Sequence, residues 1–173
     1  MKRIVISALV FCFLFTTASF AQEGYTTYEF GNHYDATFPE TWHVKINDIP
    51  SPKGDSPLLE AISPNQSSHL ILFEYDRNQK NIDDIILETQ KCMPYMVSPL
   101  MTLEESNHFT KDYMETRFLL YSGNNTKNEK LYCLIHFAFY EQEYHQIWVV
   151  GEYNKLETDR TTIEKICNSI EKF

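Results

Sequence analysis

Histidines are the residues of this chain best suited to acid–base or metal chemistry, because an imidazole can transfer a proton or bind a metal near neutral pH. The six of them are His33, His43, His69, His108, His136 and His145. No two stand three or four positions apart, and none lies in an H-E-x-x-H frame, so the pattern of a helical metal-ligand pair is missing. We therefore expect no metal site and no cofactor.

Cysteines are the other candidate nucleophiles or ligands. Cys12 lies in an apolar N-terminal stretch, and Cys92, Cys133 and Cys167 lie in the body of the chain. No C-x-x-C occurs, so neither a zinc knuckle nor a thioredoxin-type centre is predicted. Cys133 and His136 are three positions apart on an expected strand and would point to opposite faces, which argues against a thiol–imidazole pair. The later cysteines either include one disulfide or are all buried thiols, and the sequence favours thiols.

Other catalytic signatures are also missing from the sequence. An α/β-hydrolase would show a G-x-S-x-G elbow, and a phosphate-binding loop would need clustered glycines. The chain has neither, and its five glycines are widely spaced. We therefore assign no catalytic, cofactor-binding or metal-binding residue, and expect a protein that is not an enzyme.

Acidic residues outnumber basic ones, with 24 Asp and Glu against 15 Lys and Arg and a formal net charge of −9. Nucleic acids and anionic membrane surfaces attract basic patches. The charge balance therefore argues against both as partners.

The first 21 residues have the order of an export signal. Two basic residues at positions 2 and 3 precede an apolar run over Ile4–Phe15, and a small-residue cleavage site follows at Ser19–Ala21. That run is short for a membrane span, which needs about 20 residues. We expect a signal peptide over 1–21 and one mature domain over 22–173. The mature protein is then exported to the periplasm or the cell exterior, with no stable membrane insertion after cleavage.

The apolar runs Leu131–Tyr140 and His145–Val150 predict a buried β-hairpin, because the connection between them is of hairpin length. Placing Tyr140 opposite His145 puts His136 and His145 on one face, about 13 Å apart along the strands. A helical stripe then runs to the C-terminus. Its members are Ile163, Ile166, Cys167, Ile170 and Phe173.

The remaining elements complete an α+β fold. Further strands are expected at 26–30, 34–38, 42–46, 58–62, 69–75, 102–110 and 113–122. The strand at 102–110 is mostly polar and is expected to be exposed or at a sheet edge. Asn81 can cap a helix, which Pro94 should end or kink near Cys92. Because both faces of the hairpin are apolar, we predict an α/β/α sandwich, a central antiparallel sheet with a helix packed on each face.

Two stretches resemble the PsbP-like family. These are Phe38-Pro39-Glu40-Thr41-Trp42, which follows the N-terminal hairpin, and the terminal helix ending in Ile166-Cys167-Asn168-Ser169-Ile170. The resemblance implies an α/β/α sandwich, shared by the extrinsic PsbP subunit of photosystem II, a small nuclear-import factor that binds Ran, and exported bacterial proteins of undefined role. The aromatic-proline motif is structural, so neither of the two known functions is carried over with it.

The function expected from these observations is an exported, non-catalytic binding or accessory role toward an unknown protein partner or small ligand. Two alternatives stay open. One is a hydrolase-like enzyme with a site outside known motifs, and the other is a carrier of a small apolar ligand held in an enclosed cavity. Tyrosines cluster near the N-terminus and around the hairpin, and we take their role as structural, because tyrosine is common on half-buried strands.

Overall fold

The structure is a computed structural model that describes residues 24–31, 34–47, 54, 56–111 and 114–172. The expected signal peptide over 1–21 lies outside the described residues. Within the described part of the chain, no helix is both long enough and apolar enough to span a membrane.

The described part of the chain begins with five strands, continues through a helix and four long strands, and ends with a second helix and a short strand. The strands are β1 (Tyr25–Phe30), β2 (Tyr34–Pro39), β3 (His43–Ile46), β4 (Leu59–Ile62), β5 (Ser68–Asp76), β6 (Thr102–Lys111), β7 (Met114–Asn124), β8 (Lys130–Phe139), β9 (Glu143–Glu152) and β10 (Glu171–Lys172). The helices are α1 (Ile82–Met96) and α2 (Leu156–Asn168), and a single 3-10 turn, Tyr153–Lys155, leads into α2.

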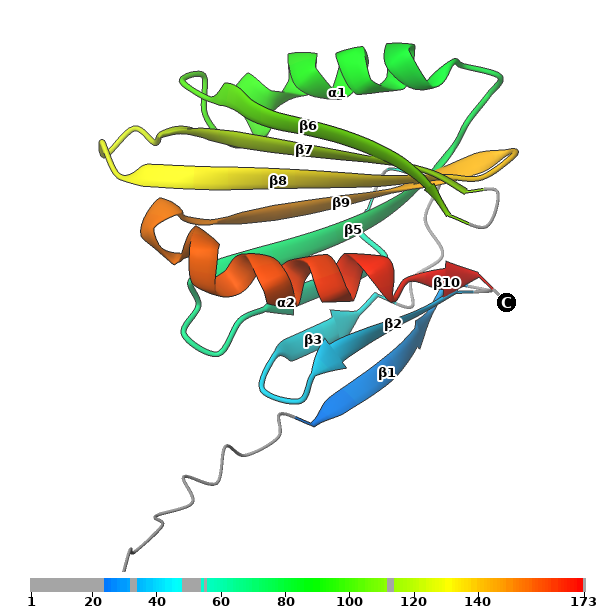
Figure 1. Ribbon diagram of the computed structural model, residues 1–173, viewed down its shortest axis with the longest axis horizontal. Coiled ribbons are helices and arrows are strands. Elements are labelled where there is room, and N and C mark those ends of the chain that lie inside the picture. The colour runs from blue at the N-terminus through cyan, green and yellow to red at the C-terminus, as the bar shows by residue number, and fades with distance from the viewer. Residues whose placement is uncertain (1–23, 32–33, 48–53, 55, 112–113, 173) are drawn as a thin grey trace, which may run out of the picture.

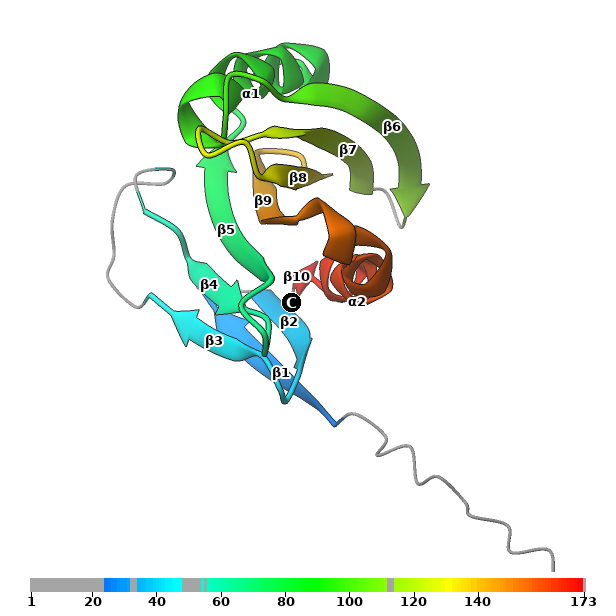
Figure 2. The same cartoon turned by 90° about the vertical axis from the view of Figure 1, so that its left-hand side faces the viewer.

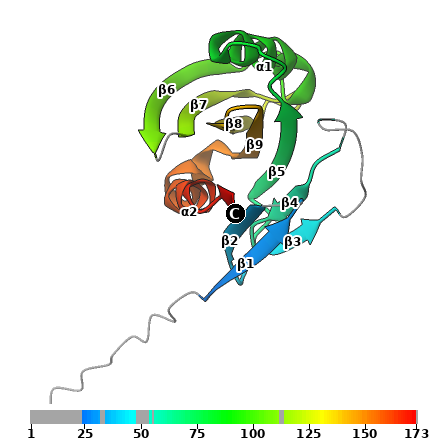
Figure 3. The same cartoon turned by 90° about the vertical axis from the view of Figure 1, so that its right-hand side faces the viewer.

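The strands form two antiparallel sheets. The large sheet has seven strands in the order β3-β4-β5-β9-β8-β7-β6, and the small sheet has the order β1-β2-β10. The polar strand β6 lies at an edge, as predicted. Figure 1 shows α1 and α2 beside the large sheet, with the small sheet next to α2. The large sheet is strongly curled, so that β6 and β7 curve around α2 while α1 lies outside the curve (Figures 2 and 3).

Alternation along the central strands divides the buried side chains into two clusters. One cluster contains Ile85 of α1 together with odd-numbered residues of β7 and β8, such as Ile135. The other contains Ile163 of α2, even-numbered residues such as Leu134, and Phe38 of the small sheet. Both clusters are apolar, and removal of this surface from water is the main term that stabilises the fold.

The α+β class, with a large antiparallel sheet and two helices, is as predicted. The predicted sandwich has one sheet, whereas the structure has a second, smaller one. The small sheet contributes Phe30, Ala36 and Phe38 to the same cluster as α2. Its third strand, β10, has only two residues. A strand that short carries no alternation from which a sequence pattern could predict it.

The Phe38–Trp42 segment leads the chain from the small sheet to the large one. Strand β2 ends at Pro39, which has no N–H to extend the ladder. The Pro39 carbonyl accepts a hydrogen bond from the N–H of Trp42 at 2.9 Å. Phe38 and Trp42 are both buried, and their ring centroids lie 6.3 Å apart. The segment therefore anchors the bend between the two sheets.

The β8–β9 hairpin has a different register from the one predicted. His136 pairs with Ile147 and Ala138 with His145, whereas the expected pairing placed Tyr140 opposite His145. The shift is an even number of residues, so every side chain stays on its predicted face. The predicted separation of His136 and His145 was wrong, because they are diagonal neighbours, with Cα atoms about 7–8 Å apart.

Helix α1 begins as predicted but ends later. Asn81 caps its N-terminus through a side-chain hydrogen bond. Pro94 does not end the helix near Cys92, and the helix continues to Met96. A proline removes the hydrogen bond to the carbonyl four residues earlier and crowds that carbonyl. At Pro94 only two helical residues follow, so little of the helix lies beyond the disturbance.

Candidate functional site

A cleft of about 400 Å³ lies between α2 and the curled end of the large sheet. Its lining consists of Asn107, His108, Phe109, Phe118, His136, Glu164, Cys167 and Asn168. The sheet register explains how three of these meet. Asn107 of β6 pairs with Phe118 of β7, which pairs with His136 of β8, so the three side chains form one row across neighbouring strands. Helix α2 supplies the opposite wall.

His136 is the most deeply placed polar side chain of this row. It is 3% exposed, and neither of its ring nitrogens has a hydrogen-bond partner among the described residues. Burial lowers the pKa of His136 to about 4, so the imidazole is neutral at pH 7. An unsatisfied buried polar group costs roughly 1–3 kcal/mol. The wall of the cleft therefore contains a neutral imidazole whose two nitrogens each expose less than 1 Å² and are unpaired in the described part of the fold.

Cys167 faces the same cleft from α2, which places a thiol and an imidazole in one site. The sequence suggested only the pair of Cys133 and His136. These two residues do point to opposite faces, since Cys133 lies in the cluster that contains Ile85 of α1. Burial raises the pKa of Cys167 well above its ordinary value. Catalytic cysteines require the opposite shift, because the thiolate is the nucleophile. The pairing in space therefore does not make a reactive thiol.

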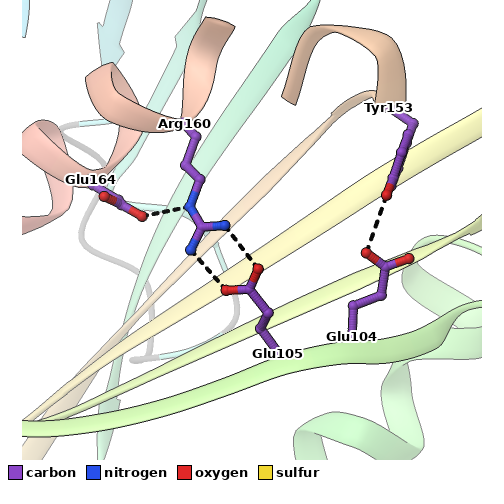
Figure 4. A network of polar contacts seen from close by, with 5 residues as sticks. All are labelled: Glu104, Glu105, Tyr153, Arg160 and Glu164. Atoms are coloured by element: carbon purple, nitrogen blue, oxygen red, sulfur yellow. Dashed lines mark hydrogen bonds and ion pairs between the residues drawn. The ribbon is translucent and has the colours of Figure 1, made fainter. Parts of the chain in front are cut away.

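Glu164 of the cleft lining also belongs to an ion-pair cluster with Arg160 and Glu105 (Figure 4). Arg160 donates to the two carboxylate oxygens of Glu105 at 2.9 and 2.8 Å, and through Nε to Glu164 at 2.8 Å. Hydrogen bonding to Arg160 lowers the pKa of Glu105. Three of the five N–H groups of the guanidinium are used by these two carboxylates, which hold Arg160 in a fixed orientation.

A β-bulge at Glu104 allows two consecutive glutamates to serve this cluster. The β6–β7 register shifts between Leu103 and Glu105, and bulges of this kind re-aim side chains. Glu104 accepts a hydrogen bond from the Tyr153 hydroxyl at 3.3 Å. The bulge therefore fastens the edge strand to both the 3-10 turn and α2. No sequence signal marked it, because bulges have no fixed motif.

The other histidines do not converge on the cleft. His108 contributes to its rim, but it pairs with Arg117 on the other face, with Nε2 3.4 Å from the Glu115 carboxylate. His69 lies beside Glu60, with 3.8 Å between nitrogen and oxygen. His145 is buried against Tyr34, with ring centroids 4.0 Å apart. The residues remaining from the original set are His43, exposed on β3, and His33, outside the described residues.

Neither a metal-ligand group nor a second cavity supplies another candidate site among the described residues. No group of three or more His, Cys, Asp or Glu among them could hold a metal ion. A second, polar cavity of about 560 Å³ lies between the β5–α1 connection and the β8–β9 turn. Arg77 there is bonded within the loops, donating through Nε to the Lys80 carbonyl at 3.1 Å. This cavity is therefore a gap between self-bonded surface loops.

Alkylation of the native protein is expected to distinguish Cys92 from the other two described cysteines. All three are free thiols, but only Cys92 is exposed. Burial raises the pKa of both Cys133 and Cys167, which suppresses their reaction. Iodoacetamide at pH 8 should modify Cys92, as measured by peptide mapping, and should reach the other two only in denaturant. Rapid native labelling of Cys167 would contradict the burial of the α2 wall.

Comparison with known proteins identifies the fold. No protein-family model matches the chain, and no curated protein matches its sequence. Among solved structures it is similar to the cyanobacterial PsbP, CyanoP, of Synechocystis sp. PCC 6803, with a TM-score of 0.66 and 11% identity over 92% of this chain and 99% of that one. LpqN of Mycobacterium tuberculosis, involved in cell envelope biogenesis, has a TM-score of 0.59 and 9% identity over 86% of this chain and 90% of that one.

A third similar structure is PA94 of Pseudomonas aeruginosa, a protein of unknown function, with a TM-score of 0.51 and 9% identity over 82% of this chain and 92% of that one. Identities at this level show a shared fold and carry no function. The architecture confirms the resemblance seen in the Phe38–Trp42 motif. The chain has the PsbP-like fold.

Proposed function

We propose that this protein is an exported, non-catalytic binding protein whose ligand site is the cleft between α2 and strands β6–β8. The observation that carries the proposal is His136, a buried imidazole with no partner among the described residues, in the lining of a cleft of about 400 Å³. That volume is within the range of small-molecule sites, which combine apolar walls with a few polar groups. Phe109 and Phe118 supply apolar wall, and Asn107 and His136 supply polar groups.

The other face of the same sheet provides an internal comparison. Gln146 of β9 is also buried there, but its Nε2 donates to Thr89 Oγ1 of α1 at 2.9 Å. On that face a buried amide is satisfied by the covering helix. On the α2 face, the described side chains leave the His136 imidazole unpaired, and a ligand in the cleft would pair with it after a small movement of the side chains that cover its nitrogens.

The proposal takes the domain as an α/β/α sandwich in which α1 shields one face and leaves ligand access to the α2 face. Export rests on the basic, apolar and small-residue order of the first 21 residues. The PsbP-like fold and the similarity to LpqN, which is involved in cell envelope biogenesis, are consistent with an accessory role outside the cytoplasm. Fold alone does not specify the ligand.

An enzymatic function is the second candidate, because Cys167, His136 and Asn168 share the cleft and thiol proteases use a Cys-His-Asn set. The raised pKa of the Cys167 thiol disfavours that chemistry. No hydrogen bond between Cys167 and His136 is found among the described side chains. The same residues therefore serve better as walls of a binding site.

Binding can be tested with N-phenyl-1-naphthylamine, an uncharged aromatic dye whose emission rises in apolar sites. We expect saturable enhancement with the wild type and about a tenfold loss of affinity in Asn107→Trp, because the indole would cover the cleft. Ser106→Trp is the matched control. Ser106 is also exposed on β6, but it pairs with Leu119 and faces the α1 side. Equal affinities in the two variants, or absence of saturable binding to the wild type, would overturn the proposed site.

A further inference from the structure

The cleft of the proposed site lies beside the free edge of the seven-stranded sheet. Strand β6 is the last strand of that sheet and pairs only with β7 among the described strands. No backbone hydrogen bond joins residues 102–111 to any other described segment. Every second residue of an edge strand points its N–H and C=O groups away from the sheet. Strand β6 therefore presents a row of main-chain donors and acceptors with which no described segment pairs.

Three consecutive residues of this edge strand, Asn107, His108 and Phe109, line the cleft. Successive side chains of a strand point to opposite faces, so lining by all three means that the cleft reaches the main chain of β6. Helix α2 forms the opposite wall. A peptide that adds a strand to an exposed sheet edge gains affinity from its main chain and specificity from pockets for its alternate side chains. The edge of β6 and the cleft beside it supply both.

The contacts at the start of β6 determine which part of its edge is open. Glu105 is bonded to Arg160 of α2, and Glu104 accepts from the Tyr153 hydroxyl (Figure 4). Residues 106–110, which follow, are all exposed. An added strand would therefore pair along 106–110, a length within the usual range of roughly 3–10 residues.

The charge beside the cleft favours a basic partner. Glu105 and Glu164 share the single guanidinium of Arg160, so two carboxylates face one cation, and only one oxygen of Glu164 accepts from it. Glu157 lies seven positions before Glu164 and hence on the same face of α2, where it adds a further negative charge. A second copy of this chain, with a formal net charge of −9, would be like-charged, whereas a basic segment is complementary.

Resting on the proposed function of the cleft, we infer that its partner is an extended, basic peptide segment of another protein, which pairs with residues 106–110 of β6 as an additional strand. One apolar side chain of that segment enters the cleft beside Phe109 and Phe118. Flanking Lys or Arg side chains lie against Glu164 and Glu157. No contact with the buried nitrogens of His136 is required.

The peptide Ac-Lys-Thr-Phe-Thr-Val-Thr-Lys-NH2 is a suitable probe, because its Lys, Phe and Val side chains share one face when it is extended. In titrations followed by amide chemical shifts, it should bind the wild type saturably. Amide hydrogen exchange at alternate residues within 106–110 should then slow by at least about tenfold, because their N–H groups become paired. A ligand that only filled the cleft would not produce this alternation.

Two N-methylated peptides test the pairing of the main chain. One carries methyl groups on its Thr nitrogens and the other on its Phe and Val nitrogens, so each lacks the donors of one edge. One version should bind like the parent and the other at least about tenfold more weakly, because a strand pairs with β6 through a single edge.

Two further comparisons test the charge and the cleft. Replacing both Lys of the peptide with Glu should weaken binding by about tenfold at low salt. Asn107→Trp should weaken binding of the parent peptide by at least about tenfold, because the indole would cover the cleft. Ser106→Trp should not, since Ser106 pairs with Leu119 and faces the α1 side. Circular dichroism of each variant establishes that it is folded.

The outcomes separate this partner from the proposed function. Dye binding that Asn107→Trp weakens, without binding of the peptide at about 1 mM, would leave the cleft as a small-molecule site and overturn the inference. Equal affinities of the two N-methylated peptides, tighter binding of the Glu peptide, or equal binding by Asn107→Trp and the wild type would also overturn it. Self-association that slows exchange at 106–110 without peptide would assign the edge to a second copy instead. If neither dye nor peptide binds the wild type, both proposals fail.

Discussion

Replacing Trp42 with alanine lowers the free energy of unfolding by about 3–5 kcal/mol, the range for truncating a large buried aromatic side chain. Trp42 is 6% exposed and packs against Phe38, with ring centroids 6.3 Å apart. Both residues belong to the cluster that joins the small sheet, α2 and the large sheet. The cavity left by the indole would therefore weaken contacts among three elements at once.

Urea unfolding measures this effect, with Trp148 kept as the fluorescent reporter. Trp148 lies in the cluster beside α1 and does not depend on Trp42 for its surroundings. Tyr95→Ala is the matched control, because Tyr95 is 91% exposed and its removal should change stability by no more than about 0.5 kcal/mol. Unfolding curves of Trp42→Ala that overlay those of the wild type would show that the aromatic-proline segment does not anchor the two sheets.

The second large effect concerns the pH dependence of stability. The wild type should lose about 3 kcal/mol between pH 7 and pH 4 through His136 alone, whereas His136→Leu should not show this component. The pKa of His136 falls from an ordinary 6.5 to about 4 because the imidazole is buried. As the pH falls below 6.5, the His136 imidazole binds a proton in the unfolded chain but not in the folded one. Stability is thus complete above pH 6.5, declines toward pH 4, and levels off below it.

The contributions of other titrating groups to the pH dependence are reduced by comparing the profile of the wild type with that of His136→Leu. The groups that face His136 are Cys167 and Glu164 of α2 and His145 of the adjacent strand β9. They are present in both proteins, so the difference between the two pH profiles reports His136 together with its coupling to these neighbours. Urea midpoints at pH 7 and pH 4.5 supply the measurement. At pH 7, His136→Leu should also be more stable by about 1–3 kcal/mol, since an unpaired polar group becomes apolar. Parallel profiles would mean that the imidazole titrates as it would in water.

The elements of the fold were predictable where period and turn chemistry agreed. The first hairpin was marked by alternation and by turn residues at 31–33, and α1 by the cap at Asn81. Pro94 does not end α1 near Cys92, because the rule against proline concerns helix interiors, whereas this proline lies in the last turn. The β8–β9 register was wrong by an even number of residues because apolar patterns fix the face of a strand but not its offset along the partner.

The candidate site could be predicted only in part. His136 stood out as a titratable residue in the apolar run Leu131–Tyr140, and a polar residue on a face expected to be buried is the signal that could have identified it. Its companions could not be found in this way. Cys167 meets it only because the sheet curls around α2, and sheet curvature has no local code. Glu105 reaches Arg160 through contacts that span 55 positions of the chain.

The small sheet links the two ends of the described chain. Strand β2 pairs with β10 through Asp35 and Glu171, and the Thr37 N–H donates to Ser169 Oγ at 2.9 Å across 132 positions. Contacts of such long sequence separation slow folding, because the intervening chain must be ordered before they form. During synthesis the first hairpin cannot gain its last partner until residues 171–172 have left the ribosome. Under the proposed export, that delay would favour passage through the translocation machinery in an unfolded state, with assembly completed on the far side.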